Sequence, residues 1–379
     1  TVYLRHTLSL EDFNMKFELN DLTPLLDLLA QPAFCTEDGV VCYCNRPARD
    51  RGLKTGVSAA SLLGAGAELP APGGAPRQVI LNLHDALASA SVLPSESGYL
   101  FLLSPAVSES VPPQALLAAA QSIRTPLSNL FAIASSLFPA LEEAEDPALQ
   151  TQIASMNRAY YQLLRLACNL TDMRCVLDGS LHLRREKSEV TVFFRDLFER
   201  AVPLCRAAGI TLTYSCSARP FAAWMDRPRL ERAVWNLLSN AIKFTPKGGS
   251  ISAELEYTPQ AARLRIRDNG DGIGPDLLAT AFDAYTRDIP LGDPRWGAGL
   301  GLSLAGRVAQ LHGGSIFLES DPGSGTSVVL SISLNTPATT ELQLRSPTAG
   351  IDYTGGYPHE LVELSDVLPL REFDSSRIN

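Results

Sequence analysis

The sequence predicts an α+β chain of several domains, in which a small α/β unit is followed by a helical hairpin and an α/β sandwich. The length of 379 residues fits two or three domains of roughly 150 residues each. Apolar residues make up 45 % of the chain, enough to build buried cores. Three shifts in composition divide the chain. We therefore divide it into a first unit (residues 1–105), a second unit (106–179), a third unit (180–335) and a tail (336–379).

The charge and the cysteines exclude several classes of protein. The chain has 32 basic and 41 acidic residues, a net charge of -9, and so offers no general attraction to nucleic acid or anionic lipid. The 7 cysteines form no C-x-x-C pair, which favours a reducing compartment over a disulfide framework or a zinc site. No apolar run approaches the ~20 residues that cross a bilayer. We expect a cytoplasmic protein with no membrane span in this chain and no nucleic-acid partner.

The first unit has the pattern of an antiparallel sheet with a short helix before it. An amphipathic series at Leu22–Leu29 predicts the helix. Residues 31–36 and Val40–Cys44 are apolar runs joined by a Glu-Asp-Gly turn, which predicts a hairpin. Further strands are expected at Arg77–Leu83 and Gly98–Leu103, and the segment between them is too short to assign. We expect a small α+β domain.

The second unit carries two helical series joined by the short acidic connector Glu142–Pro147. In both series the apolar residues are spaced alternately by four and three, at Leu116, Ala120, Ile123, Leu127, Leu130, Ala134, Leu137 and Leu141, and at Leu149, Ile153, Met156, Tyr160, Leu163, Ala167 and Leu170. One hairpin encloses only a narrow core, so we expect a homodimer in which two hairpins form a four-helix bundle. The alternative is a hairpin that packs on its own globular domains.

The third unit mixes helices with β-branched runs, which predicts an α/β sandwich with a mixed sheet on one side. Helices are expected at residues 190–207, 228–244 and 300–312, and strands at 210–214, 250–257, 262–268, 315–319 and 327–334. The tail contains the apolar run Leu361–Leu370, so it is either a linker or a docking peptide.

One helix of the third unit carries a polar stripe. Spacings of i, i+4 and i+7 put Asn236, Asn240 and Lys243 on one face. Carboxamide oxygens suit a hard cation such as Mg²⁺, and a lysine beside them suits phosphate. A solvated helix face has the same pattern when taken alone.

Three glycine-containing segments of the third unit also carry residues suited to bind a nucleotide. In Asp268–Gly274 an acid closes a strand, where it can accept a hydrogen bond from an amine such as that of adenine, although a plain turn also fits. Gly297–Leu302 opens a helix whose first N–H groups can hold phosphate, and Asp288–Trp296 before it fits a mobile lid. Gly323–Thr326 can bring a hydroxyl near the phosphates.

Together these segments resemble, in order and spacing, the catalytic and ATP-binding domain of sensor histidine kinases in the GHKL ATPase superfamily. Residues 236–244, 268–272, 282–287 and 297–302 match the N, G1, F and G2 boxes. The resemblance implies ATP and Mg²⁺ as cofactors, with Asn240 as the Mg²⁺ ligand. Lys243 would contact phosphate and Asp268 the adenine amine. The other implied nucleotide-binding residues are Gly270, Gly272, Ile273, Gly297, Gly299, Leu300, Gly301 and Thr326.

The same resemblance implies weak ATP hydrolysis. Asn236, a catalytic candidate with Lys243, takes the place where the hydrolytic GHKL members carry a glutamate that activates water. Fast hydrolysis is therefore not expected.

The second unit resembles the dimerisation and phosphotransfer domain of these kinases, but its acceptor is changed. The family motif H-E-x-R-x-P-L stands here as Q-S-I-R-T-P-L, with Gln121 in place of the histidine and Ser122 in place of the acid. A glutamine amide cannot act as the nucleophile that imidazole is. Thr125 matches the position that phosphatase-competent members use to orient water. His312 ends a helix before a glycine pair and is expected to be a structural cap, not an acceptor.

The first unit resembles a PAS sensor domain through Pro32–Phe34, Asp38–Gly39 and Tyr43–Ala48. This resemblance implies a small-molecule signal of unknown identity.

The resemblances imply a two-component sensor histidine kinase homologue that binds Mg-ATP. Because Gln121 replaces the acceptor histidine, they also imply defective autophosphorylation and therefore a pseudokinase. It would signal through ATP-dependent conformation or by phosphorylating a histidine on a partner, and its partners would be a response regulator or a partner histidine kinase. The alternative is a non-catalytic regulator that binds such a protein through the helical bundle. A chaperone-like or topoisomerase-like ATPase is disfavoured by Asn236 and by the hairpin.

Overall fold

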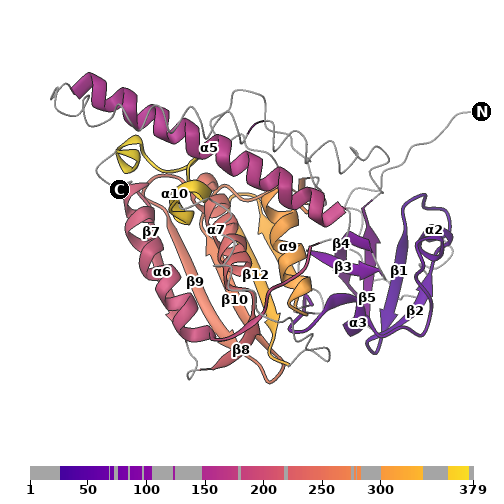
Figure 1. The fold of residues 1–379 in the computed structure, drawn as a ribbon. Coiled ribbons are helices and arrows are strands. Elements are labelled where there is room, and N and C mark those ends of the chain that lie inside the picture. Colours follow the sequence, from indigo (N-terminus) through magenta and orange to yellow (C-terminus); the bar gives the residue numbers. More distant parts are fainter. Residues whose placement is uncertain are drawn as a thin grey trace, which may run out of the picture.

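The computed structural model describes most of the first and third units, less than half of the second and part of the tail, namely residues 26–67, 69–71, 76–83, 86–95, 98–104, 123, 147–177, 181–216, 221–274, 277–278, 280–282, 300–335 and 357–374. Gln121, Thr125, Gly297, Gly299, the expected lid and nearly all of the first hairpin helix lie outside these residues. Ten of the strands described in the first and third units form one continuous sheet, in the order β2-β1-β5-β4-β3-β11-β12-β10-β9-β7 (Figure 1).

The first unit contains the expected antiparallel sheet. Its strands are β1 (Ala33–Glu37), β2 (Val40–Cys44), β3 (Arg77–Leu83), β4 (Ala86–Pro94) and β5 (Gly98–Leu103), with the short helices α2 (Arg46–Asp50) and α3 (Ala59–Leu63) beside them. The hairpin is confirmed, and its turn places both Asp38 and Gly39 at positive φ, the conformation that a two-residue turn requires. β4 fills the segment that the sequence left unassigned.

The third unit is the predicted α/β sandwich. Its helices are α6 (Val190–Ala207), α7 (Arg227–Phe244) and α9 (Gly301–Leu311), and its strands are β7 (Thr211–Cys216), β9 (Ser250–Tyr257), β10 (Ala261–Asp268), β11 (Ile316–Asp321) and β12 (Gly325–Ser333). The sheet is mixed, as expected, because β7 pairs parallel to β9 while β10 pairs antiparallel to β9 and β12. The pairing of β6 (Glu186–Glu189) with β8 (Ala222–Met225) was not predicted.

The two units are joined along a sheet edge. β3 pairs antiparallel with β11, with Val79 opposite Phe317, and Arg77 forms an ion pair with Glu319 at 2.9 Å. A sheet edge left open would expose unpaired N–H and C=O groups. The first unit therefore covers the edge of the third, a contact that no local sequence pattern indicated.

The second unit is represented by α5 (Pro147–Leu177), which lies across α7 and α9 (Figure 1). Tyr161, Leu164 and Cys168 on α5 join the core of the third unit. Met156 and Leu163, both on the predicted apolar stripe, are 39 % and 42 % exposed among the described residues. For α5, the structure agrees with the alternative of a hairpin that packs on its own globular domains. The homodimer stays a prediction.

The tail docks on the protein. Its helix α10 (His359–Glu363) and the 3-10 helix η2 (Leu370–Phe373) contact α5, and α10 also contacts α7. Leu361, Val362, Leu364, Leu368 and Phe373 belong to the core of the third unit. Residues 357–374 of the tail are therefore a docking segment and not a linker. None of the described helices combines the length and apolar character that crossing a bilayer requires.

His312 is a structural residue, as expected. It lies 4 % exposed at the end of α9, where its Nδ1 donates to the carbonyl of Val308 at 2.8 Å. Its Nε2 accepts from the backbone N–H of Asp226, the cap of α7, at 3.0 Å. Only the neutral imidazole can do both. Burial is the main cause that lowers the pKa of His312 to about 4.

We predict that His312 makes folding sensitive to acid. Because its folded pKa of about 4 lies below the unfolded value of about 6.5, its contribution to stability is full above pH 6.5 and is lost as the pH falls toward 4. Urea unfolding at pH 7.5 and 4.5 should show the free energy of the unmodified chain falling by roughly 2–3 kcal/mol more than that of His312→Gln. An equal loss in the two proteins would contradict this assignment.

We predict that the contact between the first and third units tolerates no side chain at Gly64. This residue has φ +82, and a Cβ there would lie 2.2 Å from the carbonyl oxygen of Gly314 in the third unit. Gly64→Ala should lower the free energy of unfolding by roughly 2–3 kcal/mol through strain and displaced backbone. Gly39→Ala is the matched control, because Gly39 has φ +75 with nothing within 4 Å, and should cost about 1 kcal/mol. Equal losses in urea unfolding would refute the proposed close approach.

Candidate functional site

The polar stripe of α7 is held by a well-capped helix. Asp226 caps α7 by accepting from the backbone N–H of Arg229 at 3.2 Å, and a proline stands in its first turn. Asn236 is 2 % exposed, whereas Asn240 and Lys243 are half-buried. Burial of Asn236 does not fit the alternative of a solvated helix face, because a buried amide needs partners.

Asn236 has a partner for each end of its amide. Its Nδ2 donates to the carbonyl of Arg232 at 3.1 Å, and its Oδ1 accepts from Nη2 of Arg165 on α5 at 3.3 Å. Gly301, the first residue of α9, stands against it, since a Cβ there would lie 2.9 Å from Oδ1. Asn236 therefore lies beside the N-terminus of α9.

Asp268 ends β10 with its carboxylate buried and only partly satisfied. Its Oδ1 accepts from the backbone N–H of Gly270 at 2.9 Å and of Thr326 at 3.1 Å. No hydrogen bond between described residues ends on Oδ2. Burial is the largest influence and raises the pKa of Asp268, while the backbone N–H donors oppose the shift. A buried carboxylate with one oxygen open is suited to accept an N–H from a ligand.

The glycines after Asp268 approach protein backbone. A Cβ on Gly270 would lie 2.3 Å from the carbonyl oxygen of Phe244, and one on Gly272, which has φ +71, would lie 2.1 Å from that of Asp321. The family resemblance implies that Gly270 and Gly272 bind the nucleotide. In the structure they let this segment contact the end of α7 and the turn between β11 and β12, and so fix the place of Asp268.

Thr326 belongs to the surroundings of Asp268. Its backbone N–H donates to that carboxylate, and its hydroxyl lies 2.9 Å from Oγ of Ser320. Ser320 also accepts from the backbone N–H of Ile273 at 2.8 Å. The expectation that the Thr326 hydroxyl stands near the phosphates stays a prediction, and in this structure that hydroxyl is paired with Ser320. Sequence reasoning missed Ser320, because nothing in an alternating strand marks it.

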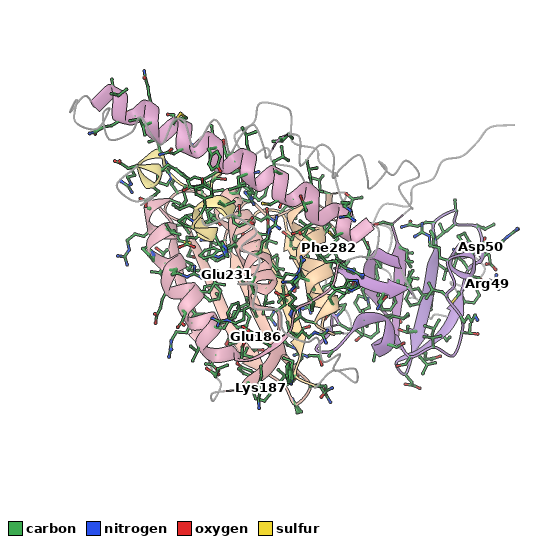
Figure 2. The ribbon with its side chains drawn as sticks, in the orientation of Figure 1. Arg49, Asp50, Glu186, Lys187, Glu231 and Phe282 are labelled. Atoms are coloured by element: carbon green, nitrogen blue, oxygen red, sulfur yellow. The ribbon has the colours of Figure 1, made fainter. Side chains whose placement is uncertain are left out.

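The start of α9 provides backbone donors. Leu300 precedes the helix and is buried, and no described side chain caps this end. The first N–H groups of a helix without a cap are suited to bind an anion. Phe282, the first residue of the expected F box, is buried in the same unit (Figure 2).

The donor set fits a nucleotide with a divalent cation. Asp268 offers an acceptor for an amine, Lys243 a cation, and α9 a row of N–H groups. No cluster of three or more histidine, cysteine or acidic side chains suited to a metal occurs among the described residues. Mg²⁺ held by Asn240 would therefore take its other ligands from water and phosphate, as this ion commonly does.

Residues 225–336 match the family model of the histidine kinase-, DNA gyrase B- and HSP90-like ATPases. The match contains Asn236, Asn240, Lys243, Asp268 and Thr326. The third unit thus carries an ATPase domain of this type.

The chain is also similar to sensor kinases over about half its length. It is 30 % identical over 205 residues to the sensor protein DivL of Caulobacter vibrioides, covering 54 % of this chain and 26 % of that protein. It is 30 % identical over 219 residues to the sensor histidine kinase RppB of Synechocystis, covering 55 % of this chain and 46 % of that protein. A crystal structure of full-length ShkA with AMPPNP aligns with a TM-score of 0.48 at 23 % identity, covering 60 % of this chain and 47 % of that one. The chain thus spans less than half of each of these three proteins.

Proposed function

We propose that this chain is a sensor histidine kinase homologue that binds Mg-ATP and does not phosphorylate itself. The observation that carries the proposal is Asp268, a buried carboxylate in the ATPase domain whose Oδ1 is bonded while Oδ2 is open for a donor. An unpartnered carboxylate oxygen on an otherwise buried residue is suited to accept an N–H from a ligand.

Each side chain has a separate task in this proposal. Asp268 accepts the amine of adenine, and the fixed backbone around Gly270 keeps the carboxylate in place. Lys243 and the N–H groups of α9 bind phosphate oxygens, and Asn240 binds Mg²⁺, which neutralises phosphate charge when bound. Gly297 and Gly299 are proposed to continue the phosphate-binding loop.

The absence of a phosphoacceptor histidine at residue 121 limits how the protein can signal. Gln121 supplies no imidazole nucleophile, and Asn236 cannot activate water as a glutamate does. We propose that the chain signals by ATP-dependent conformation or by phosphorylating a histidine of a partner kinase, with a response regulator as the other candidate partner. Thr125 remains the proposed residue for orienting water in a phosphatase reaction.

The remaining parts fit a sensor that acts on this site. The antiparallel sheet of the first unit supports the proposed PAS-like domain, and its pairing with β11 offers a direct route to the third unit. The exposed Met156 and Leu163 of α5 support dimerisation through the hairpin. The competing proposal, a non-catalytic regulator that binds a partner through this hairpin, draws on the same two residues.

We predict that Asp268→Asn weakens Mg-ATP binding by about 30-fold in isothermal titration calorimetry, because the amide presents a donor toward the adenine amine and a charge-assisted hydrogen bond is lost. Glu199→Gln is the control, since it removes an exposed carboxylate of α6 that lies outside the four matched boxes, and it should change affinity less than about twofold. Equal affinities of Asp268→Asn and the unmodified chain would contradict the assigned role.

We predict that the unmodified chain takes up no acid-labile phosphate from labelled Mg-ATP and that Gln121→His does. The imidazole would supply the nucleophile that the glutamine lacks. Label on the unmodified chain would contradict the loss of the acceptor. Failure of Gln121→His to be labelled, with ATP binding intact, would show that the ATPase domain cannot reach residue 121.

A further inference from the structure

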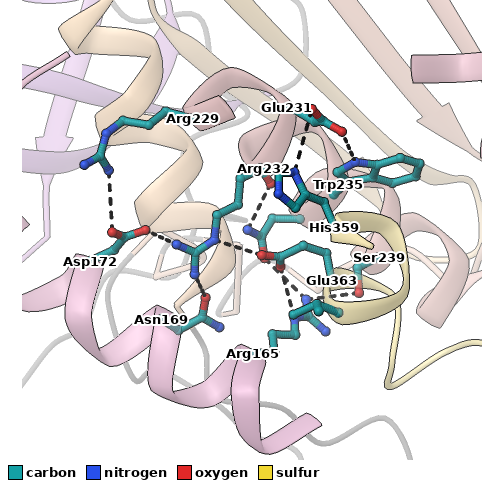
Figure 3. A network of polar contacts seen from close by, with 12 residues as sticks. Arg165, Asn169, Asp172, Arg229, Glu231, Arg232, Trp235, Ser239, His359 and Glu363 are labelled. Carbon is teal, nitrogen blue, oxygen red and sulfur yellow. Dashed lines mark hydrogen bonds and ion pairs between the residues drawn. The ribbon is translucent and has the colours of Figure 1, made fainter. Parts of the chain in front are cut away.

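The docked tail brings a fully buried carboxylate to the boundary between α5 and α7. Glu363, the last residue of α10, has 0 % of its surface exposed. Its Oε1 accepts from Nε of Arg232 on α7 at 2.8 Å, and its Oε2 lies 3.3 Å from Nε of Arg165 on α5 (Figure 3). One carboxylate therefore ties three separate segments of the chain together.

The charges around Glu363 are balanced locally. Arg232 also binds Asp172, and its Nη2 donates to Oδ1 of Asn169 at 2.7 Å (Figure 3). Arg165 binds Asp366 of the tail through Nη1 at 2.8 Å. Burying a single charge without such partners is strongly unfavourable. Both carboxylate partners of Arg165 belong to the docked tail, whereas Arg232 is also held by Asp172 and Asn169 of α5.

Arg165 extends this network to the candidate site. Its Nε forms an ion pair with Glu363 without a hydrogen bond, and its Nη1 donates to Asp366. Its third nitrogen, Nη2, donates to Oδ1 of Asn236 at 3.3 Å and to Oγ of Ser239 at 3.2 Å. The planar guanidinium can make these contacts at once because its donors point in fixed directions.

Removal of Arg165 would leave the amide oxygen of Asn236 buried without a charged donor. An unsatisfied buried acceptor is costly, so the amide would rotate or admit water. Asn236 stands beside Gly301 at the start of α9, where phosphate is expected. A change at Asn236 therefore acts on the phosphate end of the site and leaves Asp268 in place.

We propose that Arg165 is a positioning residue of the nucleotide site and that Glu363 sets its place, so that ATP affinity depends on docking of residues 357–374. The inference rests on the proposed function, since it assigns regulation of the same site. Coupling of this kind is reciprocal, and bound ATP stabilises the docked tail in return.

The test compares affinities for Mg-ATP and Mg-ADP by calorimetry in the full chain. Arg165→Lys keeps a charge near Glu363 but has a single nitrogen, so it cannot also reach Asn236. We expect Arg165→Lys and Glu363→Gln to weaken ATP binding about tenfold and ADP binding less than twofold. Glu360→Gln is the matched control on the same helix, because Glu360 pairs with the exposed Arg200 at 3.0 Å and should leave both affinities unchanged.

The outcomes separate the inference from the function on which it rests. If the variants bind ATP and ADP more weakly by the same factor, they merely loosen the domain, and the positioning role is overturned. Unchanged affinities in both variants would overturn it as well. If Glu363→Gln fails to fold, Arg165→Lys alone decides. An unmodified chain that binds neither nucleotide would overturn the proposed function and the inference together, whereas normal binding with unaffected variants would overturn the inference only.

Discussion

The pairing of Glu363 with Arg165 and Arg232 is the interaction on which the described arrangement of α5, α7 and the tail depends. A carboxylate with no exposed surface is stable only because two guanidinium groups meet it, and those groups come from different helices. The apolar residues of the tail fill the space around this pair. The tail is thus a part of the folded core, and α5 is fixed to the ATPase domain.

The candidate site divides into two ends with different supports. Asp268 is held by contacts within the third unit, from Gly270, Thr326 and the close approach of Gly272 to Asp321. Asn236 is held partly from outside that unit, by Arg165 of α5. The proposed adenine end is therefore intrinsic to the domain, whereas the proposed phosphate end is open to control by the tail and by α5. Such an arrangement supports the proposed use of ATP binding as a signal.

Local sequence pattern predicted the elements whose signal lies in consecutive residues. The helix Val190–Ala207 was predicted with its observed bounds, and the Asp-Gly turn specified the first hairpin. β4 was missed because its alternating alanine and serine residues carry little β preference. Asp268 and Asn236 were found through motifs, but Arg165 was not, because it lies 71 residues before Asn236. The pairing of β3 with β11 and the docking of Glu363 likewise depend on contacts between distant residues.

Hydrogen exchange of the tail in the unmodified chain tests the central claim most directly. The backbone N–H groups of Val362 and Leu364 donate to the carbonyls of Pro358 and Glu360 at the two ends of α10, at 3.2 and 2.9 Å, and exchange when the segment undocks. With saturating Mg²⁺ and a non-hydrolysable ATP analogue, their exchange should slow by about tenfold, because nucleotide binding and docking are coupled. Unchanged exchange of these amides in a chain that has bound the nucleotide would contradict the account.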